Sequence, residues 1–340
     1  MVTDTPHRVR FGAYLPAYHL AGADAPSARF LASYAQQAET LGFDSLWVID
    51  HLFVSPPSYR VAFLDPITVL SIAAAVTEHV TLGTGILVLP LRDPVLLAKA
   101  LATLDVVSGG RLIFGAGVGW NREELDACQI DRPTRGRRMD EMLDIISGLW
   151  MHDSFSYDGK HFVLRDVRLV PRPVQKPRPP IWLAAGSVPS GTSPHITAQK
   201  GYLPERSLRR VARIGDALMS AYRSVPDGDT TFLARDRATL DRLARDAGRE
   251  PNELTHAIQD HMYIRLDGSP AEIESAVERF TYRPFADIAP YYLLGTPDAI
   301  IPRIQARIAA GVQEIAINFI DRSPQQLELF ARYIRPYVAG

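Results

Sequence analysis

Short runs of apolar residues alternate along the chain with longer stretches in which apolar residues recur every three or four positions. The short runs are nearly continuous, which is typical of strands buried on both faces of a parallel sheet. The longer stretches, such as RRMDEMLDIISGLW at 137–150, are typical of helices that pack one face inward. The pattern predicts eight strands, at 9–16, 45–49, 80–89, 111–117, 181–185, 216–221, 257–266 and 314–320.

Eight strands that alternate with helices predict an α/β protein with a (β/α)8 TIM barrel, and a doubly wound open sheet is the alternative. Four helix starts carry a capping side chain before a proline at the first helical position. A glutamine three residues after the last of these caps, at position 326, predicts a capping box. The four pairs are Asp65-Pro66, Asp93-Pro94, Thr296-Pro297 and Ser323-Pro324.

Two intervals interrupt this alternation. Residues 152–180 show a β-like pattern around an Asp158-Gly159 turn and then five prolines, which predicts a hairpin and an extended tail. Residues 186–205 hold glycine and proline turn points and no helical period. We expect both to be insertions on the C-terminal face of a single barrel domain spanning 1–340, where they could roof a pocket.

Composition narrows the classes of function. The net charge of −1, with acidic and basic residues mixed along the chain, gives no footprint for nucleic acid or an anionic membrane. No stretch approaches 18 uninterrupted apolar residues, so we expect a soluble, cytoplasmic protein. Cys128 is the only cysteine, and the histidines show neither HxH nor HExxH spacing, so we expect no metal site. No G-x-S-x-G elbow is present either.

In such a barrel, functional residues follow the C-terminal ends of the strands. His51 in WVIDHLF could exchange protons near neutral pH, and Asp50 could hold its tautomer or cap the next segment. The alternative for His51 is a histidine that is hydrogen-bonded in a turn. Other residues near the C-terminal ends of the predicted strands are candidates for the same reason. They are Tyr14, Pro16, Tyr18, Phe53, Gly85, Ile86, Val88, Gly117, Gly119, Trp120, Asn121, Gly186 and Ser187.

The glycine-rich stretch GGRLIFGAGVGWN at 109–121 is a weak match to a dinucleotide loop. Its spacing is G-x-G-x-G, it lies in the fourth strand unit, and the acid about twenty residues on, Asp140, falls inside an amphipathic helix. We therefore interpret it as a barrel strand. Gly109-Gly110 would end the preceding helix, and Gly117 and Gly119 would leave room at the barrel mouth for a flat ring.

Three stretches of the chain together resemble the luciferase-like superfamily of flavin- and deazaflavin-dependent oxidoreductases. They are LGTGILVLPLRDPVLLAKALATLDVVSGGRLIFGAGVGWNREEL, RGRRMDEMLDIISGLW and VRLVPRPVQKPRPPIWLAAGS. The resemblance is continuous over about 8–187 and closest to the F420-dependent branch. It implies that His51 is the active-site histidine, with Asp50 as its acidic neighbour. It also implies a cis peptide at Gly85-Ile86 against the cofactor ring. The backbone of Ala185, Gly186 and Ser187 would hold the phosphate or tail of the cofactor.

Two departures from the family pattern affect the expected substrate. Trp120 stands where related sugar-phosphate dehydrogenases carry a catalytic carboxylate, so an indole would stack on a ring or an apolar substrate, or serve as a wall. The 186–205 insertion separates Gly186 from the helix ERSLRRVARIGDA, which leaves open whether Arg209 or Arg210 points at a phosphate or lies on a solvated face.

The leading hypothesis is a coenzyme F420-dependent oxidoreductase that transfers a hydride between the deazaflavin and a medium-sized organic substrate. Val88, Gly117 and Gly119 would border the cofactor, and family analogy implies a homodimer. One alternative is an FMN-dependent monooxygenase supplied by a separate reductase, and another is a non-catalytic flavin-binding barrel. The residues expected to line the substrate side are Tyr14, Tyr18, Phe53, Trp120 and His195.

Overall fold

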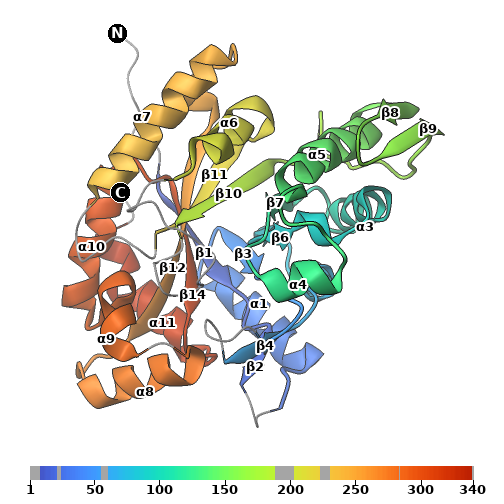
Figure 1. The fold of residues 1–340 in the computed structure, drawn as a ribbon. Coiled ribbons are helices and arrows are strands. Elements are labelled where there is room, and N and C mark those ends of the chain that lie inside the picture. The colour runs from blue at the N-terminus through green and yellow to red at the C-terminus, as the bar shows by residue number, and fades with distance from the viewer. Residues whose placement is uncertain are drawn as a thin grey trace.

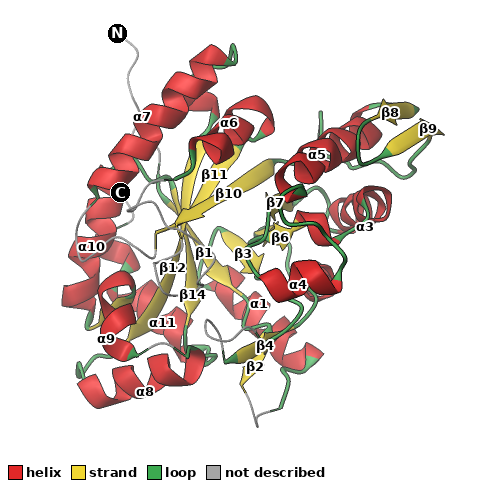
Figure 2. Cartoon of the chain, viewed as in Figure 1, coloured by secondary structure: helices red, strands yellow, loops and turns green. Residues whose placement is uncertain are grey.

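The computed structural model describes residues 8–20, 24–54, 60–187, 203–222, 230–282 and 284–338. Eight parallel strands pair in the order β10, β11, β12, β14, β1, β3, β5, β7, and β7 pairs with β10 to close the ring. Helices surround the strands (Figures 1 and 2). The predicted (β/α)8 barrel is confirmed. Its strands are β1 (Arg10–Tyr14), β3 (Ser45–Val48), β5 (Thr81–Thr84), β7 (Leu112–Gly117), β10 (Ile181–Ser187), β11 (Ala217–Tyr222), β12 (Thr255–Ile264) and β14 (Glu314–Phe319).

The long helices cover the outside of the barrel and bury their apolar stripes against it. None of the helices in the described part of the chain is long and apolar enough to cross a membrane. The outer helices are α1 (Ala28–Thr40), α2 (Pro66–Val76), α3 (Pro94–Val107), α5 (Arg135–Met151), α6 (Glu205–Ile214), α7 (Thr231–Asp246), α10 (Pro297–Ala309) and α11 (Gln325–Tyr333).

The predicted caps divide into two groups. The Asp65 carboxylate accepts the Thr68 N–H, and the Asp93 carboxylate accepts two N–H groups at the start of α3, as expected. Thr296 precedes α10, but its side chain makes no cap hydrogen bond. The capping box at Gln326 is wrong, because its side-chain amide instead pairs with both the N–H and the carbonyl of Ile264 on β12.

The third barrel strand is interrupted. The predicted strand at 80–89 forms β5 and a second short strand, β6 (Leu87–Val88), which pairs with β7. Between them the Gly85–Ile86 peptide bond is cis, as the resemblance implies. Gly109 and Gly110 end α3 with positive φ angles of 70° and 84°, which confirms their expected role as a helix stop.

The insertion at 152–180 contains the expected antiparallel hairpin, β8 (Phe155–Asp158) and β9 (Val163–Val167). It does not roof the mouth, which we define as the C-terminal ends of the barrel strands. The hairpin packs on α5, where the Glu141 carboxylate accepts the N–H groups of residues 160–162 (Figure 1). The predicted position is wrong because this segment joins a helix to the following strand, and such connections lie at the N-terminal ends of the strands. Most of the second insertion, 188–202, lies outside the described residues.

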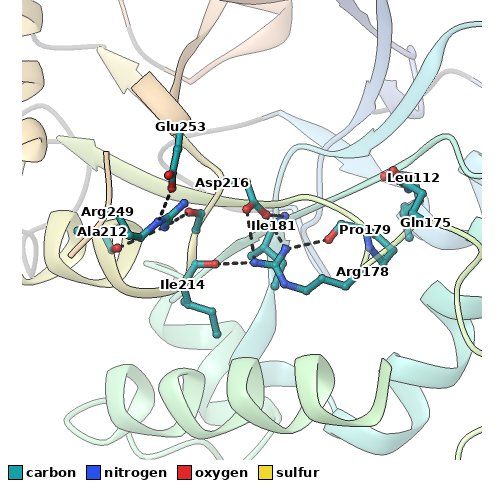
Figure 3. A network of polar contacts seen from close by, with 11 residues as sticks. Leu112, Gln175, Arg178, Pro179, Ile181, Ala212, Ile214, Asp216, Arg249 and Glu253 are labelled. Atoms are coloured by element: carbon teal, nitrogen blue, oxygen red, sulfur yellow. Dashed lines mark hydrogen bonds and ion pairs between the residues drawn. The ribbon is translucent and has the colours of Figure 1, made fainter. Parts of the chain in front are cut away.

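Ion pairs and backbone hydrogen bonds close the N-terminal end of the barrel. Arg178 pairs with Asp216 at 2.5 Å and donates to the Ile214 carbonyl at 3.0 Å (Figure 3). The Asp216 carboxylate also accepts the Ile181 N–H at 2.7 Å, so it fixes the start of β10. A 3-10 turn, η2 (Pro251–Glu253), completes this edge, where Glu253 pairs with Arg249 at 3.3 Å.

Inside the barrel, the lowest layer is a hydrogen-bonded polar cluster under two indoles. The buried Glu314 carboxylate pairs with Arg10 at 2.9 Å and accepts the Ser45 hydroxyl at 2.6 Å. Ser45 in turn accepts the Trp47 indole N–H at 2.7 Å, and Trp47 packs on Trp182 with ring centroids 5.0 Å apart. Burial raises the pKa of Glu314, and the Arg10 guanidinium opposes that shift.

Candidate functional site

His51 follows β3 and is held by a carboxylate from a distant part of the chain. A short helix, α4 (Arg122–Ala127), begins after β7 and carries Glu124, whose side chain is 1% exposed. One carboxylate oxygen of Glu124 lies 3.0 Å from His51 Nδ1 and accepts the Leu52 N–H at 2.8 Å. The carboxylate therefore favours a proton on Nδ1 and fixes the ring plane, so that proton exchange with a bound molecule would use Nε2.

Asp50 does not hold the imidazole. Its carboxylate forms a two-pronged ion pair with Arg92, at 2.6 and 2.8 Å, and accepts the Val88 N–H at 2.8 Å. The expectation that Asp50 fixes the His51 tautomer is therefore corrected, because the Asp50 side chain points to β6 while Glu124 takes the histidine. Asp50 fastens the end of β3 to the interrupted third strand.

The Gly85–Ile86 bulge is braced from the neighbouring side of the barrel. The Tyr14 hydroxyl donates to the Gly85 carbonyl at 3.0 Å, and Tyr14 is buried. A Cβ at Gly85 would lie 2.5 Å from the Tyr14 hydroxyl oxygen, so only glycine fits beneath it. Tyr14 thus supports the bulge, and its hydroxyl is already engaged there.

The two mouth glycines lie directly against protein side chains. A Cβ at Gly117 would lie 2.1 Å from the tip of Ile86, and one at Gly119 would lie 2.5 Å from Val88. Gly119 also has a φ of +74°, a backbone conformation that suits glycine. Each glycine thus makes room for a side chain of the interrupted third strand, and the expectation that the two glycines leave room for a cofactor ring stays a prediction.

A series of aromatic side chains, which we call the aromatic chain, runs across one half of the mouth. His51 contacts Trp120 and Phe63, with ring centroids 5.4 and 5.5 Å apart. Tyr18 contacts Phe63 at 6.0 Å and Phe280 at 5.5 Å. His261 then contacts Phe280 at 5.5 Å and stacks on Tyr292 at 4.4 Å. These rings pack against one another beside His51, and Phe63 and Trp120 among them are partly exposed.

Elements between the barrel strands supply this chain. Tyr18 and Phe63 lie opposite each other on an antiparallel pair, β2 (Tyr18–Leu20) and β4 (Val61–Phe63). Phe280 ends α8 (Pro270–Phe280), and Tyr292 follows η3 (Ala289–Tyr291) and precedes β13 (Leu293–Gly295). Together with α9 (Phe285–Ile288), these elements form a second apolar cluster apart from the main core. The strands β2 and β4 and the helices α8 and α9 are labelled in the lower part of Figure 1.

The other residues expected to line the substrate side lie in different surroundings. The Tyr18 hydroxyl donates to the Ile320 carbonyl at 2.9 Å, and burial raises the pKa of Tyr18. Phe53 is 43% exposed in the segment after His51, and Trp120 is partly exposed beside the histidine. His195 lies outside the described residues. Tyr18 therefore contributes a ring face, and Trp120 is the expected substrate residue that contacts His51.

The opposite half of the mouth is made of small side chains. Strand alternation turns Gly117 of β7, Ala184 of β10 and Ala221 of β11 inward at this level. Ala184, Ala221 and Ile86 are partly exposed there. On these three strands the inward side chains at this level are no larger than a methyl group, and Ile86 lies beside them.

The expected phosphate-binding segment lies at the edge of this half of the mouth. Gly186 and Ser187 pair with Ala221 and Tyr222 of β11, whereas the Ala185 side chain is buried toward the helices. Arg210 is turned away, because it pairs with Asp140 at 2.5 Å and donates to the Gly136 carbonyl. Arg209 pairs with Glu205 on its own exposed helix face. Both arginines are thus engaged by carboxylates of α5 and α6.

Sequence reasoning missed Glu124, Arg92 and the rings of Phe63, Phe280, His261 and Tyr292. Only Glu124 carried a local signal, since Asn121 caps α4 and places Glu124 in its first turn. The remaining contacts join segments that lie far apart in sequence. Among the described residues, no three His, Cys, Asp or Glu side chains gather as metal ligands.

The family model for luciferase-like monooxygenases matches residues 9–314. An F420-dependent glucose-6-phosphate dehydrogenase of Microbacterium testaceum is 31% identical over 320 residues, covering 90% of this chain and 92% of that protein. An FMNH2-dependent dimethylsulfone monooxygenase of Pseudomonas putida is 26% identical over 295 residues, covering 81% and 78%. The solved structure of the monooxygenase RslO1 from Streptomyces bottropensis has a TM-score of 0.78 at 26% identity, covering 96% of this chain and 99% of that chain. The chain belongs to the luciferase-like family, whose members are flavin- or deazaflavin-dependent oxidoreductases and monooxygenases.

Proposed function

We propose that this protein is a coenzyme F420-dependent oxidoreductase that transfers a hydride between the deazaflavin and a partly apolar organic substrate. The observation that carries the proposal is the buried His51–Glu124 pair at the mouth, whose imidazole contacts Trp120 of the aromatic chain. A deazaflavin supplies the hydride acceptor or donor when bound. The 31% identical F420-dependent relative supports this cofactor, and the FMNH2-dependent relative keeps FMN as the alternative.

One half of the mouth would hold the cofactor, and the other half would bind the substrate. Gly117, Ala184 and Gly186, with Ile86, would support one ring face of the cofactor, and the end of β10 would hold its phosphate-bearing tail. The aromatic chain would bind the apolar part of the substrate and exclude water from the reacting atoms.

His51 Nε2 would move the proton that accompanies hydride transfer, because Glu124 holds Nδ1 at 3.0 Å and prevents the ring from turning. Trp120 contacts the imidazole and stands where sugar-phosphate dehydrogenases would need a carboxylate. An indole at that place favours a substrate with an apolar ring or chain over a sugar phosphate.

A direct titration tests the choice of cofactor. The purified protein is titrated with F420 and, separately, with FMN, and binding is followed by cofactor fluorescence. Micromolar binding of F420 that is tighter than binding of FMN supports the proposal. Tight FMN binding with no response to F420 would overturn it in favour of the monooxygenase alternative.

A further inference from the structure

Asn318 is a buried amide with an unused donor. It lies on β14, is 2% exposed, and its Nδ2 has no hydrogen-bond partner within the described residues. A buried amide without a partner loses its hydrogen bonds to water and gains nothing in return, which destabilises the folded protein. Native proteins keep few such groups, so this one requires a specific explanation.

The strand register places Asn318 inside the mouth. Glu314 and Ala316 on the same strand face the barrel interior, where Glu314 meets Ser45 and Ala316 packs in the interior cluster. β14 pairs without a bulge along its length with β12, so alternation turns Asn318 inward as well. Asn318 thus lies one inward layer above Ala316, close to the C-terminal end of its strand.

The surroundings of Asn318 belong to the half of the mouth lined by the aromatic chain. His261 is its register partner on β12, and the His261 ring stacks on Tyr292. One inward position below His261, Gln259 is partly exposed, so solvent reaches this depth of the barrel interior. The amide is therefore buried beside the aromatic chain, one inward layer above a part of the barrel interior that solvent reaches.

We propose that Asn318 binds an oxygen atom of the substrate, a carbonyl or a hydroxyl, by donating a hydrogen bond from Nδ2. This inference deepens the proposed function and rests on its assignment of the aromatic half to the substrate. A molecule with an apolar ring or chain and one oxygenated carbon matches both features, since the rings bind its hydrocarbon part and the amide binds its oxygen. The substrate class is then an alcohol or ketone.

The test compares cyclohexanone with methylenecyclohexane, in which a CH2 group replaces the oxygen. Binding of each probe is measured by ligand-observed NMR, with and without bound cofactor, on the wild-type protein and on Asn318→Leu and Asn318→Ala. The exposed Asn252→Leu is the matched control. We expect the wild type to bind the ketone about fivefold more tightly than its hydrocarbon analogue, the difference that one neutral hydrogen bond provides. Both Asn318 variants should lose that preference, while the control keeps it.

Thermal unfolding of the cofactor-free variants gives a second readout. Asn318→Leu should unfold at the wild-type temperature or above it, because no hydrogen bond within the protein is lost. An unchanged ketone preference in both variants, or equal binding of the two probes to the wild type, would overturn the inference and leave the cofactor assignment intact. A water molecule bound to the amide would produce the equal-binding result. Failure of the cofactor titration, by contrast, would overturn the proposed function alone, because the probe comparison is also made without cofactor.

Discussion

The two ends of the barrel differ in how their buried polar groups are hydrogen-bonded. At the N-terminal end, Arg111 donates to four carbonyls and one hydroxyl, and Asp216 joins Arg178 to the start of β10. At the mouth, Glu124 is engaged with His51, but Asn318 Nδ2 has no partner among the described residues. Apart from His256, the polar groups named at the N-terminal end are paired within the protein, whereas at the mouth the Asn318 donor is not.

This difference separates stability from function within one fold. A polar network that is fully paired gains rigidity and costs little, whereas an unpaired buried group destabilises the empty protein. The difference agrees with the general division of such barrels, in which the C-terminal ends of the strands carry chemistry and the N-terminal ends carry stability. Substitutions at the two ends should therefore change different measured quantities.

The largest effect is expected at the mouth. His51→Ala should lower the rate of hydride transfer by about 10²- to 10⁴-fold, because it removes the proton-transfer group. The midpoint of thermal unfolding and the cofactor dissociation constant should change little. Stopped-flow measurement of cofactor oxidation or reduction checks the rate, with the exposed His79→Ala as control. A near-normal rate in His51→Ala would remove the histidine from the mechanism.

At the opposite end, Glu314→Ala should lower the free energy of unfolding by about 3 kcal/mol, because it leaves Ser45 without its acceptor and Arg10 without its partner. Arg10 is 43% exposed and can turn to solvent, which moderates the loss. Chemical denaturation measures the change, and the exposed Glu274→Ala is the control. Should the folded variant lose cofactor binding while keeping its stability, the division between the two ends is wrong.

His256 is the exception at the N-terminal end, and it predicts acid sensitivity. It is fully buried outside the barrel at the start of β12, its Nδ1 has no partner in the described residues, and burial lowers its pKa to about 4 from 6.5. Below pH 6.5 His256 is protonated in the unfolded chain, whereas in the folded chain it stays neutral until about pH 4. The free energy of unfolding should therefore fall across this window, by up to ~3 kcal/mol.

Denaturation of the wild type and of His256→Gln between pH 4 and 7 checks this prediction. The variant lacks the titrating group, so its stability should depend less on pH within the window. Parallel pH profiles of the two proteins would show that other groups cause the acid sensitivity.

A smaller effect is expected at Glu124. Glu124→Gln keeps the size and a hydrogen-bond acceptor but removes the charge, so the rate of hydride transfer should fall about tenfold while cofactor affinity is maintained. Its exposed neighbour on α4 provides the control Glu123→Gln. If both variants have the wild-type rate, Glu124 is only a brace for the backbone at Leu52.

The barrel was predictable because its signals are local. Each buried strand is a short apolar run, and all eight were located from such runs, although β12 begins two residues earlier than expected. The cis peptide and the hairpin also followed from the sequence or from the family resemblance. The packing position of the hairpin did not, because alternation within a hairpin does not indicate which helix it contacts.

The site was only half predictable, for a related reason. Strand ends indicate that His51 faces the mouth, but its partner Glu124 is 73 positions away on a six-residue helix. The adjacent Asp50 was the local choice and proved to bind Arg92 instead. Asn318 lies inside a continuous apolar run, where its sequence position gives no sign that its donor is unused.

Gly117 at the end of β7 has a consequence for which substitutions this protein can accept. Ile86 occupies the position that a side chain at 117 would otherwise take, so Gly117 and Ile86 form a matched pair, whereas Gly119 is also required by its positive φ. We expect positions 86 and 117 to vary together among relatives. A mutant library meant to reshape the cofactor surface should therefore randomise both members of a pair at once, since single changes would meet a clash that only the second change relieves.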